Sequence, residues 1–316
     1  MRIGIFDSGL GGLSVLRAIG RAIDEQAAQG QPLPVTQLLY VADSGHAPYG
    51  EKSHQAVQAR SVVVADFLKA QGADILVIAC NTATAVAAKP LREAHPDWPI
   101  VGVEPGVKPA AALTRNGRIG VMATEMTLAS DKFRLLAQAH AAHVELALQP
   151  CPGLAAAIEG GDLDAAPLRP LITSCCAPLR EQGVDTVVLG CTHYPFVAHH
   201  IAAEFGPGVT LVDTADAVAQ RTLALTRGLA DKSEHRLLTS ADQPAERLGT
   251  AGSPQATTHP AVTAPPTSAW TLRLWTSGEV GTLQRLLHDW LNLPGKVSAL
   301  PDPMRQLPLP AASLDS

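Results

Sequence analysis

The chain has 316 residues, of which 46% are hydrophobic, 17% charged and 4% aromatic, and its formal net charge is −5 at pH 7. This length suffices for one large or two ordinary globular domains, and the acidic balance gives no electrostatic support for nucleic-acid binding. No run of about 18 uncharged apolar residues predicts a membrane span, and the N-terminus does not resemble a signal peptide. We therefore expect a cytoplasmic protein with neither nucleic acid nor membrane as partner.

Apolar runs alternate with segments of helical periodicity along the first third of the chain. Strand, helix, strand, helix in this order is typical of βαβ units and of an α/β fold with a parallel sheet. The apolar patterns predict buried strands at 2–6, 36–43, 73–80 and 99–104, with helices at 12–28 and 54–72.

The same alternation continues beyond residue 110. Strands are expected at 117–124, 143–150, 184–191, 209–213 and 270–278, and helices at 128–141, 168–183 and 280–293. The residues from 240 to 269 are rich in Pro, Thr, Ala and Ser without periodicity, which predicts a mobile insertion.

An internal repeat is visible in the letters. "RIGIFDS" at 2–8 aligns with "RIGVMAT" at 118–124, and "QGADILVIAC" at 71–80 aligns with "QGVDTVVLGC" at 182–191. The two offsets differ by only a few residues, which indicates a duplication. We expect two pseudosymmetric three-layer α/β domains with parallel-sheet cores, one formed by 1–104 plus 215–316 and the other by 105–214.

Polar residues follow four of the predicted strands. Ligands of parallel α/β sheets bind beyond the carboxyl ends of the strands, so two facing halves would bring these residues into one cleft. The four groups are Asp7-Ser8, Cys80-Asn81-Thr82, Ala123-Thr124 and Cys191-Thr192-His193.

The glycine turn after the first strand, "FDSGLGG", has two interpretations. Glycines that open a helix can cradle a phosphate, but Ser14 replaces the third glycine of the dinucleotide pattern, and Asp7 would place a negative charge beside the phosphates. The alternative is a tight turn. Asp7 itself could cap the next helix or assist proton transfer at a nearby thiol.

The five cysteines are Cys80, Cys151, Cys175, Cys176 and Cys191. The odd count and the absence of a C-x-x-C spacing argue against disulfides and a metal site, so reduced thiols are expected. We interpret Cys151, Cys175 and Cys176 as packing residues.

Cys80 and Cys191 differ from the other three because they follow equivalent strands of the repeat. Cys191 and His193 could form a nucleophilic pair for acyl transfer, which would leave Cys80 idle. Two thiols on opposite sides of a planar carbanion could instead invert a stereocentre, since a thiol with a pKa of about 8.5 can serve as either base or acid.

Five segments together resemble the cofactor-independent aspartate/glutamate racemase family: "IGIFDSGLGGLSVL", "YVADSGHAPYGEKS", "IACNTATA", "GVEPGVKPA" and "LGCTHYPF". The resemblance runs from residue 2 to about 230. It implies two pseudosymmetric α/β domains with the active site between them, no cofactor and no metal. The implied reaction is the interconversion of L- and D-glutamate, which supplies D-glutamate for peptidoglycan and cell-wall synthesis. The assembly that we expect is a homodimer.

The resemblance also implies roles for individual residues. Cys80 would act on the D-isomer and Cys191 on the L-isomer, with Asp7 and His193 assisting their proton transfers. Thr127 matches a G-T-x-x-T motif whose glycine is Ala123 here. Substrate contacts are expected from Asp7, Ser8, Pro48, Tyr49, Gly50, Asn81, Thr82, Thr124, Thr127, Glu159, Thr192 and His193.

Two other functions stay open at this point. An aspartate racemase of the same superfamily would share the motifs, and turnover of the two amino acids measured side by side would distinguish it. A non-catalytic nucleotide-binding α/β module would use the glycine turn, and it would be stabilised by a nucleotide but not by glutamate.

Overall fold

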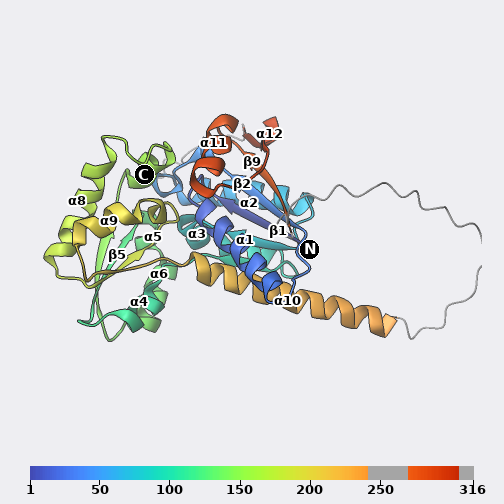
Figure 1. Ribbon diagram of the computed structural model, residues 1–316, viewed down its shortest axis with the longest axis horizontal. Coiled ribbons are helices and arrows are strands. Elements are labelled where there is room, and N and C mark those ends of the chain that lie inside the picture. The colour runs from blue at the N-terminus through green and yellow to red at the C-terminus, as the bar shows by residue number, and fades with distance from the viewer. Residues whose placement is uncertain (241–269, 306–316) are drawn as a thin grey trace, which may run out of the picture.

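The computed structural model describes residues 1–240 and 270–305, and their strands form two parallel sheets in two lobes (Figure 1). Sheet A draws its strands from both ends of the chain, and sheet B from the middle. This is the α/β class that the sequence predicts. The expected insertion at 240–269 lies outside the described residues, except for Ser240 at the end of a helix. The domain boundaries at 104/105 and 214/215 stay a prediction.

Sheet A has six strands in the order β10-β9-β2-β1-β3-β4, and all neighbouring pairs are parallel. β1 lies at the centre, so its carboxyl end faces the middle of the sheet edge. The strands are β1 (Arg2–Asp7), β2 (Gln37–Ala42), β3 (Ile75–Ile78), β4 (Ile100–Gly102), β9 (Thr271–Thr276) and β10 (Val297–Ala299).

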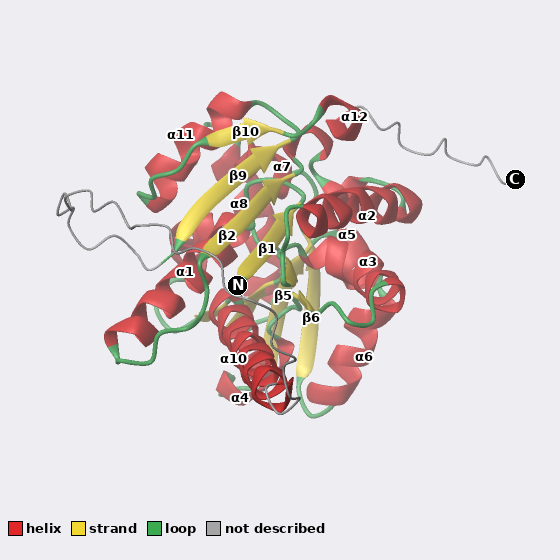
Figure 2. Cartoon of the chain, turned by 90° about the vertical axis from the view of Figure 1, so that its right-hand side faces the viewer, coloured by secondary structure: helices red, strands yellow, loops and turns green. Residues whose placement is uncertain are grey.

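Helices cover both faces of sheet A, because its strands are apolar on both sides (Figure 2). Ile3 and Ile5 of β1 pack with one group of helices, and Phe6 packs with the other. The first group is α1 (Leu13–Ala28), α10 (Ala215–Ser240) and α11 (Val280–Leu291), and the second is α2 (His54–Ala70) and α3 (Asn81–Ala94).

Sheet B repeats the central part of sheet A. Its order is β6-β5-β7-β8, which matches β2-β1-β3-β4, and it is also parallel. β5 and β7 thus occupy the places of β1 and β3, as the sequence repeat predicts. The strands are β5 (Arg118–Ala123), β6 (Glu145–Pro150), β7 (Thr186–Leu189) and β8 (Thr210–Val212).

Sheet B is also covered on both faces. Cys151, Cys175 and Cys176 lie buried in the core on one of them, which agrees with their interpretation as packing residues. That face carries α7 (Leu154–Glu159), α8 (Leu168–Glu181) and α9 (Ala198–Phe205), and the other carries α4 (Val107–Leu113) and α6 (Asp131–His140). The short elements are η1 (Ser44–His46), η2 (Tyr49–Glu51), α5 (Glu125–Ala129), η3 (Tyr194–Val197) and α12 (Asp302–Arg305).

Several predicted strands end two residues earlier than expected, and two of the wrong boundaries have a local reason. The expected helix at 128–141 is interrupted at Ser130, whose hydroxyl accepts a hydrogen bond from Phe133 N at 3.1 Å and so caps α6. The expected strand at 73–80 ends at Ile78, because Cys80 is already the N-cap of α3.

No helix among the described residues is both long and apolar enough to cross a membrane.

The carboxylate of Asp185, just before β7, ties the loop ahead of β5 to sheet B. Burial opposes its ionisation, but the hydrogen bonds it accepts outweigh burial and lower its pKa to about 2. The donors are Thr114 Oγ1 at 2.6 Å, Arg115 N at 2.7 Å, Asn116 N at 2.8 Å and Thr186 Oγ1 at 3.0 Å.

Asp185→Asn is expected to lower the free energy of unfolding at pH 7 by about 1–2 kcal/mol, since the loop loses charge-assisted hydrogen bonds. A lowered folded-state pKa stabilises the protein above the unfolded pKa of about 3.9, and this stabilisation is lost as the pH falls toward 2. Urea unfolding at pH 7 and pH 3 should show the deficit shrink. Asp164→Asn, at an exposed carboxylate, is the control. An equal deficit at both pH values would contradict this explanation.

Candidate active site

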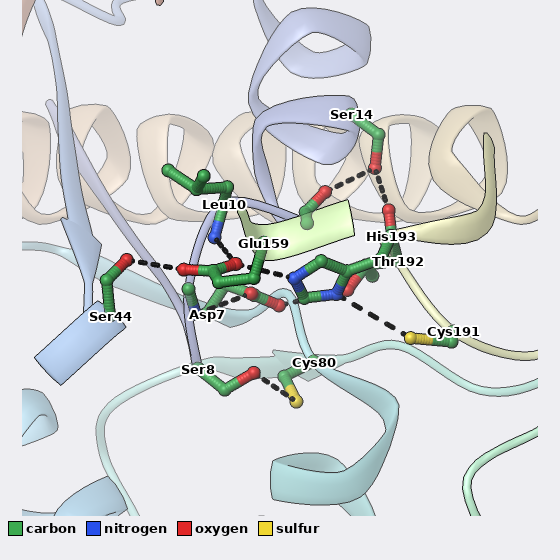
Figure 3. Close-up of polar contacts among 12 residues, drawn as sticks. Asp7, Ser8, Leu10, Ser14, Ser44, Cys80, Glu159, Cys191, Thr192 and His193 are labelled. Carbon is green, nitrogen blue, oxygen red and sulfur yellow. Dashed lines mark hydrogen bonds and ion pairs between the residues drawn. The ribbon is translucent and has the colours of Figure 1, made fainter. Parts of the chain in front are cut away.

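The carboxyl ends of the strands in the two sheets meet, and the polar residues that follow them lie together (Figure 3). Asp7 ends β1, Cys80 caps α3 after β3, and Cys191 follows β7. Cys80 and Cys191 are 5% and 8% exposed. The structure therefore brings both predicted thiols to one buried region between the sheets.

Cys80 lies in an environment that disfavours its thiolate. Its sulfur is 3.6 Å from Ser8 Oγ and accepts from Ala83 N at 3.4 Å. Burial raises the pKa of Cys80 to about 12, with the negative charge of Asp7 and the proximity of Cys191 acting in the same direction. Cys80 is thus a protonated thiol at neutral pH, a proton donor in the resting site.

Cys191 has the opposite kind of neighbour. Its sulfur is 3.6 Å from His193 Nδ1, while His193 Nε2 is 2.7 Å from Glu159 Oε2. Burial favours the neutral imidazole, but the hydrogen bonds to Cys191 and Glu159 outweigh it and raise the pKa of His193 well above its ordinary value. The protonated imidazole of His193 is thus a proton-carrying group within 3.6 Å of the Cys191 sulfur.

Glu159 connects the two halves of the molecule. It ends α7 beside sheet B, yet its carboxylate accepts from Leu10 N at 2.7 Å and from Ser44 Oγ at 2.7 Å, both on the sheet A side. Figure 3 shows this carboxylate between Ser44, Leu10 and His193. Glu159 therefore fixes the orientation of His193. The sequence placed Glu159 only near the substrate, whereas the structure gives it this specific partner.

Asp7 is not a helix cap, because the N-cap of α1 is Gly12. Its carboxylate accepts from Gly9 N at 2.8 Å and from Thr192 Oγ1 at 3.0 Å. Complete burial raises its pKa from the ordinary 3.8 to about 6, against the opposing effect of the charge on His193. Such a carboxyl can accept or release a proton near neutral pH.

The glycines of the "GLGG" turn permit the second half to approach the first. A Cβ on Gly9 would collide with the carboxylate of Glu159, and a Cβ on Gly11 would collide with His193 and Thr192. The space that a phosphate would need is thus occupied by a carboxylate and an imidazole. This favours the tight-turn interpretation over the phosphate cradle.

Hydroxyl groups from both halves form a cluster on the other side of the site. Thr82 Oγ1 is 3.0 Å from Thr124 Oγ1, which donates to Thr127 Oγ1 at 2.9 Å. Asn81 is 5% exposed, and its side-chain oxygen has no hydrogen-bond partner among the described residues. An unpaired buried amide oxygen is costly, so it indicates a place for a ligand's donor group.

The predicted segment Pro48-Tyr49-Gly50 lies at the edge of this cluster. A Cβ on Gly50 would be 2.8 Å from Thr124 Cγ2, so the two halves are in contact there. A cavity of about 190 Å³ adjoins it, lined among others by Pro48 and Gly50 from one half and by Thr124 and Cys151 from the other.

Sequence reasoning missed Ser44, Leu10 and Asp43. Ser44 and the Leu10 N–H bind Glu159, which is 115 and 149 residues away, and no local pattern signals such contacts. Asp43 had a signal, because it follows the strand β2 just as Asp7 ends β1. Across residues 1–240 and 270–305, no group of three or more His, Cys, Asp or Glu residues has a metal-binding arrangement.

Known proteins are similar to this chain in sequence. The family model described as Asp/Glu/Hydantoin racemase matches residues 3–222. A glutamate racemase of Ectopseudomonas mendocina is 46% identical over 285 residues, or 90% of this chain and 92% of the relative.

Solved structures agree. The crystal structure of glutamate racemase isoform RacE1 from Bacillus anthracis has a TM-score of 0.71 at 28% identity, covering 95% of this chain and 97% of that one. Escherichia coli glutamate racemase, solved with L-glutamate and the activator UDP-MurNAc-ala, has a TM-score of 0.70 at 26% identity with the same coverage. The relatives named above are glutamate racemases, and the chain belongs to the Asp/Glu/hydantoin racemase family.

Proposed function

We propose that this chain is an isomerase that interconverts L- and D-glutamate with two cysteines as the bases and no cofactor. The main support is the pair of buried thiols that follow the equivalent strands β3 and β7 and lie near enough for the charge of Cys191 to act on Cys80. A single nucleophile would need only one of them, whereas inversion at a carbon needs a base on one face and an acid on the other.

For the L-isomer we assign proton removal to Cys191. The imidazolium of His193 lies 3.6 Å from this sulfur, and Glu159 holds the imidazolium in place. The planar carbanion then takes a proton from the thiol of Cys80 on the opposite face, which gives the D-isomer. Each step moves one proton, and no electrons leave the substrate.

For the D-isomer the roles reverse, and Cys80 must lose its proton first. Asp7, with a pKa of about 6, is the nearby group proposed to assist this transfer, with Ser8 Oγ accepting from the thiol. His193 returns a proton to the Cys191 side.

Substrate binding is assigned to donors and acceptors around the sulfurs. The unpaired side-chain oxygen of Asn81 suits an ammonium group, and the hydroxyls of Thr82, Thr124 and Thr127 suit a carboxylate. The N-terminus of α3 adds a favourable electrostatic field for an anion. The proposed set is completed by Asp7, Ser8, Pro48, Tyr49, Gly50, Glu159, Thr192 and His193.

We place this reaction in the cytoplasm, where D-glutamate would enter peptidoglycan synthesis, with the two enantiomers as the small-molecule partners. Neither nucleic acid nor membrane is a proposed partner, and a homodimer stays a prediction. The proposed domains are 1–104 plus 215–316 and 105–214.

Incubation with L-glutamate in deuterated water is expected to give D-glutamate that carries deuterium at Cα, without added pyridoxal phosphate, because the returning proton comes from a thiol in exchange with solvent. Chiral chromatography with mass spectrometry measures both quantities. L-aspartate in a parallel reaction is the control, and faster turnover of aspartate would favour the aspartate racemase. Glutamate that stays L and unlabelled would contradict the proposal, and an acyl-enzyme trapped on Cys191 would support a hydrolase instead.

A further inference from the structure

Arg60 of α2 is a charged residue on the buried face of its helix. It is 2% exposed and follows Ala56 and Val57 at the helical spacing of the apolar stripe. Its guanidinium donates from Nε to Asp43 Oδ2 at 2.9 Å and from Nη2 to Asp43 Oδ1 at 2.7 Å. Such a two-pronged contact fixes both groups in one orientation.

Asp43 passes this constraint to the segment after β2. Its Oδ2 accepts from Tyr49 OH at 2.6 Å, and its Oδ1 is 3.2 Å from His46 Nδ1. Burial alone would raise the pKa of Asp43, but the hydrogen bonds from His46 and Arg60 outweigh it and lower the pKa. Asp43 and Tyr49 are 0% and 1% exposed, so this network is shielded from water.

The network ends at the proposed substrate site. Tyr49 begins η2, and the next residue, Gly50, contacts Thr124 of the other half. Thr124 in turn meets Thr82 at 3.0 Å, one residue beyond Asn81. The third donor of Arg60, Nη1, binds Met304 O at 2.7 Å, which holds the C-terminal end of the described chain against the same helix.

We propose that Arg60 is a positioning residue for substrate binding, which acts through Asp43 and Tyr49 to hold residues 48–50 against the Thr82–Thr124 cluster. This assignment rests on the proposed function. The catalytic sulfurs and their partners Asp7 and His193 lie on other elements, so a loosened segment should weaken binding of the ground state and transition state alike. It should therefore raise KM and leave kcat nearly unchanged.

Arg60→Lys keeps the positive charge but loses the planar fork, and it is expected to raise KM for glutamate about tenfold with kcat within about twofold. Tyr49→Phe removes only the hydroxyl that donates to Asp43, and about a threefold rise in KM is expected. Arg92→Lys is the matched control, because Arg92 also uses two donors, toward Ile100 O, but away from the site, and its KM should not change. Steady-state kinetics in both directions and thermal unfolding are measured for each variant.

The outcomes distinguish failure of the positioning role of Arg60 from failure of the proposed racemase function. Wild-type turnover with an unchanged KM in both Arg60→Lys and Tyr49→Phe would overturn the positioning role alone. A merely structural role would lower the active fraction, so apparent kcat would fall in proportion to stability while KM stayed constant, and this too would overturn it. Absence of any wild-type turnover would overturn the proposed function and this assignment with it.

Discussion

Cys80→Ala and Cys191→Ala are each expected to lower glutamate racemisation by about 10³-fold or more, because each removes one of the two groups that exchange a proton with Cα. Methyl side chains leave no replacement base, and both sulfurs are buried, so bulk water cannot substitute efficiently. Circular dichroism of L- and D-glutamate solutions measures the loss in both directions. Because inversion needs both faces, the two variants should be similarly impaired.

Cys176→Ala is the matched control for these variants. Cys176 is also fully buried, but it lies on α8 in the core of the second half and has no place in the proposed chemistry. It should retain the wild-type rate per folded molecule, with any change confined to the melting temperature. Full turnover in Cys191→Ala would show that one thiol suffices and would defeat the two-base mechanism.

Asp7→Asn is expected to separate activity from stability. Racemisation should fall by about 10²-fold or more, since an amide cannot accept the proton from Cys80. The free energy of unfolding at pH 8 should rise by about 1–3 kcal/mol, because the variant no longer buries a carboxylate whose pKa is raised from 3.8 to about 6. An Asn side chain can keep both contacts, accepting from Gly9 N and donating to Thr192 Oγ1.

The sign of this stability change depends on pH. A raised folded-state pKa means that Asp7 destabilises the native protein fully above pH 6, progressively less between pH 6 and 3.8, and not at all below. Urea unfolding of wild type and variant at pH 8 and pH 4.5 should therefore show the gain shrink. Asp185→Asn provides the opposite case, with a loss at neutral pH. An Asp7→Asn protein that is less stable at pH 8 would mean that its hydrogen bonds outweigh burial.

Local patterns were sufficient for much of the fold. Apolar runs located the strands around Ile3 and Ile75, because a parallel sheet covered on both faces needs continuous hydrophobic strands. The repeat predicted that β5 and β7 would take the places of β1 and β3. The break of a helix at Ser130 was missed, since its capping hydroxyl competes with an otherwise helical apolar spacing.

The candidate site was only partly accessible from the sequence. Motifs identified Cys80 and Cys191 as candidate catalytic residues. Which side chains contact the two sulfurs, however, depends on how the two halves of the molecule pack against each other. Ser44 donates a hydrogen bond to Glu159, and Gly11 lies so close to His193 that a Cβ would collide with it. Both pairs are more than a hundred positions apart in the sequence. The buried ion pair of Arg60 had a signal in the sequence, because a charged residue on an apolar helical stripe usually has a buried partner.

The unequal partners of the two sulfurs have a consequence for turnover of mirror-image substrates. L- and D-glutamate have the same free energy in water, so their equilibrium constant is one and kcat/KM must be identical in the two directions. Cys191 has an imidazolium beside it and Cys80 a carboxylate. This asymmetry can therefore make kcat and KM differ between the two directions, but not the ratio kcat/KM. The enantiomer with the lower KM must have a proportionally lower kcat. At low substrate concentration the asymmetric site therefore converts L- and D-glutamate at equal rates.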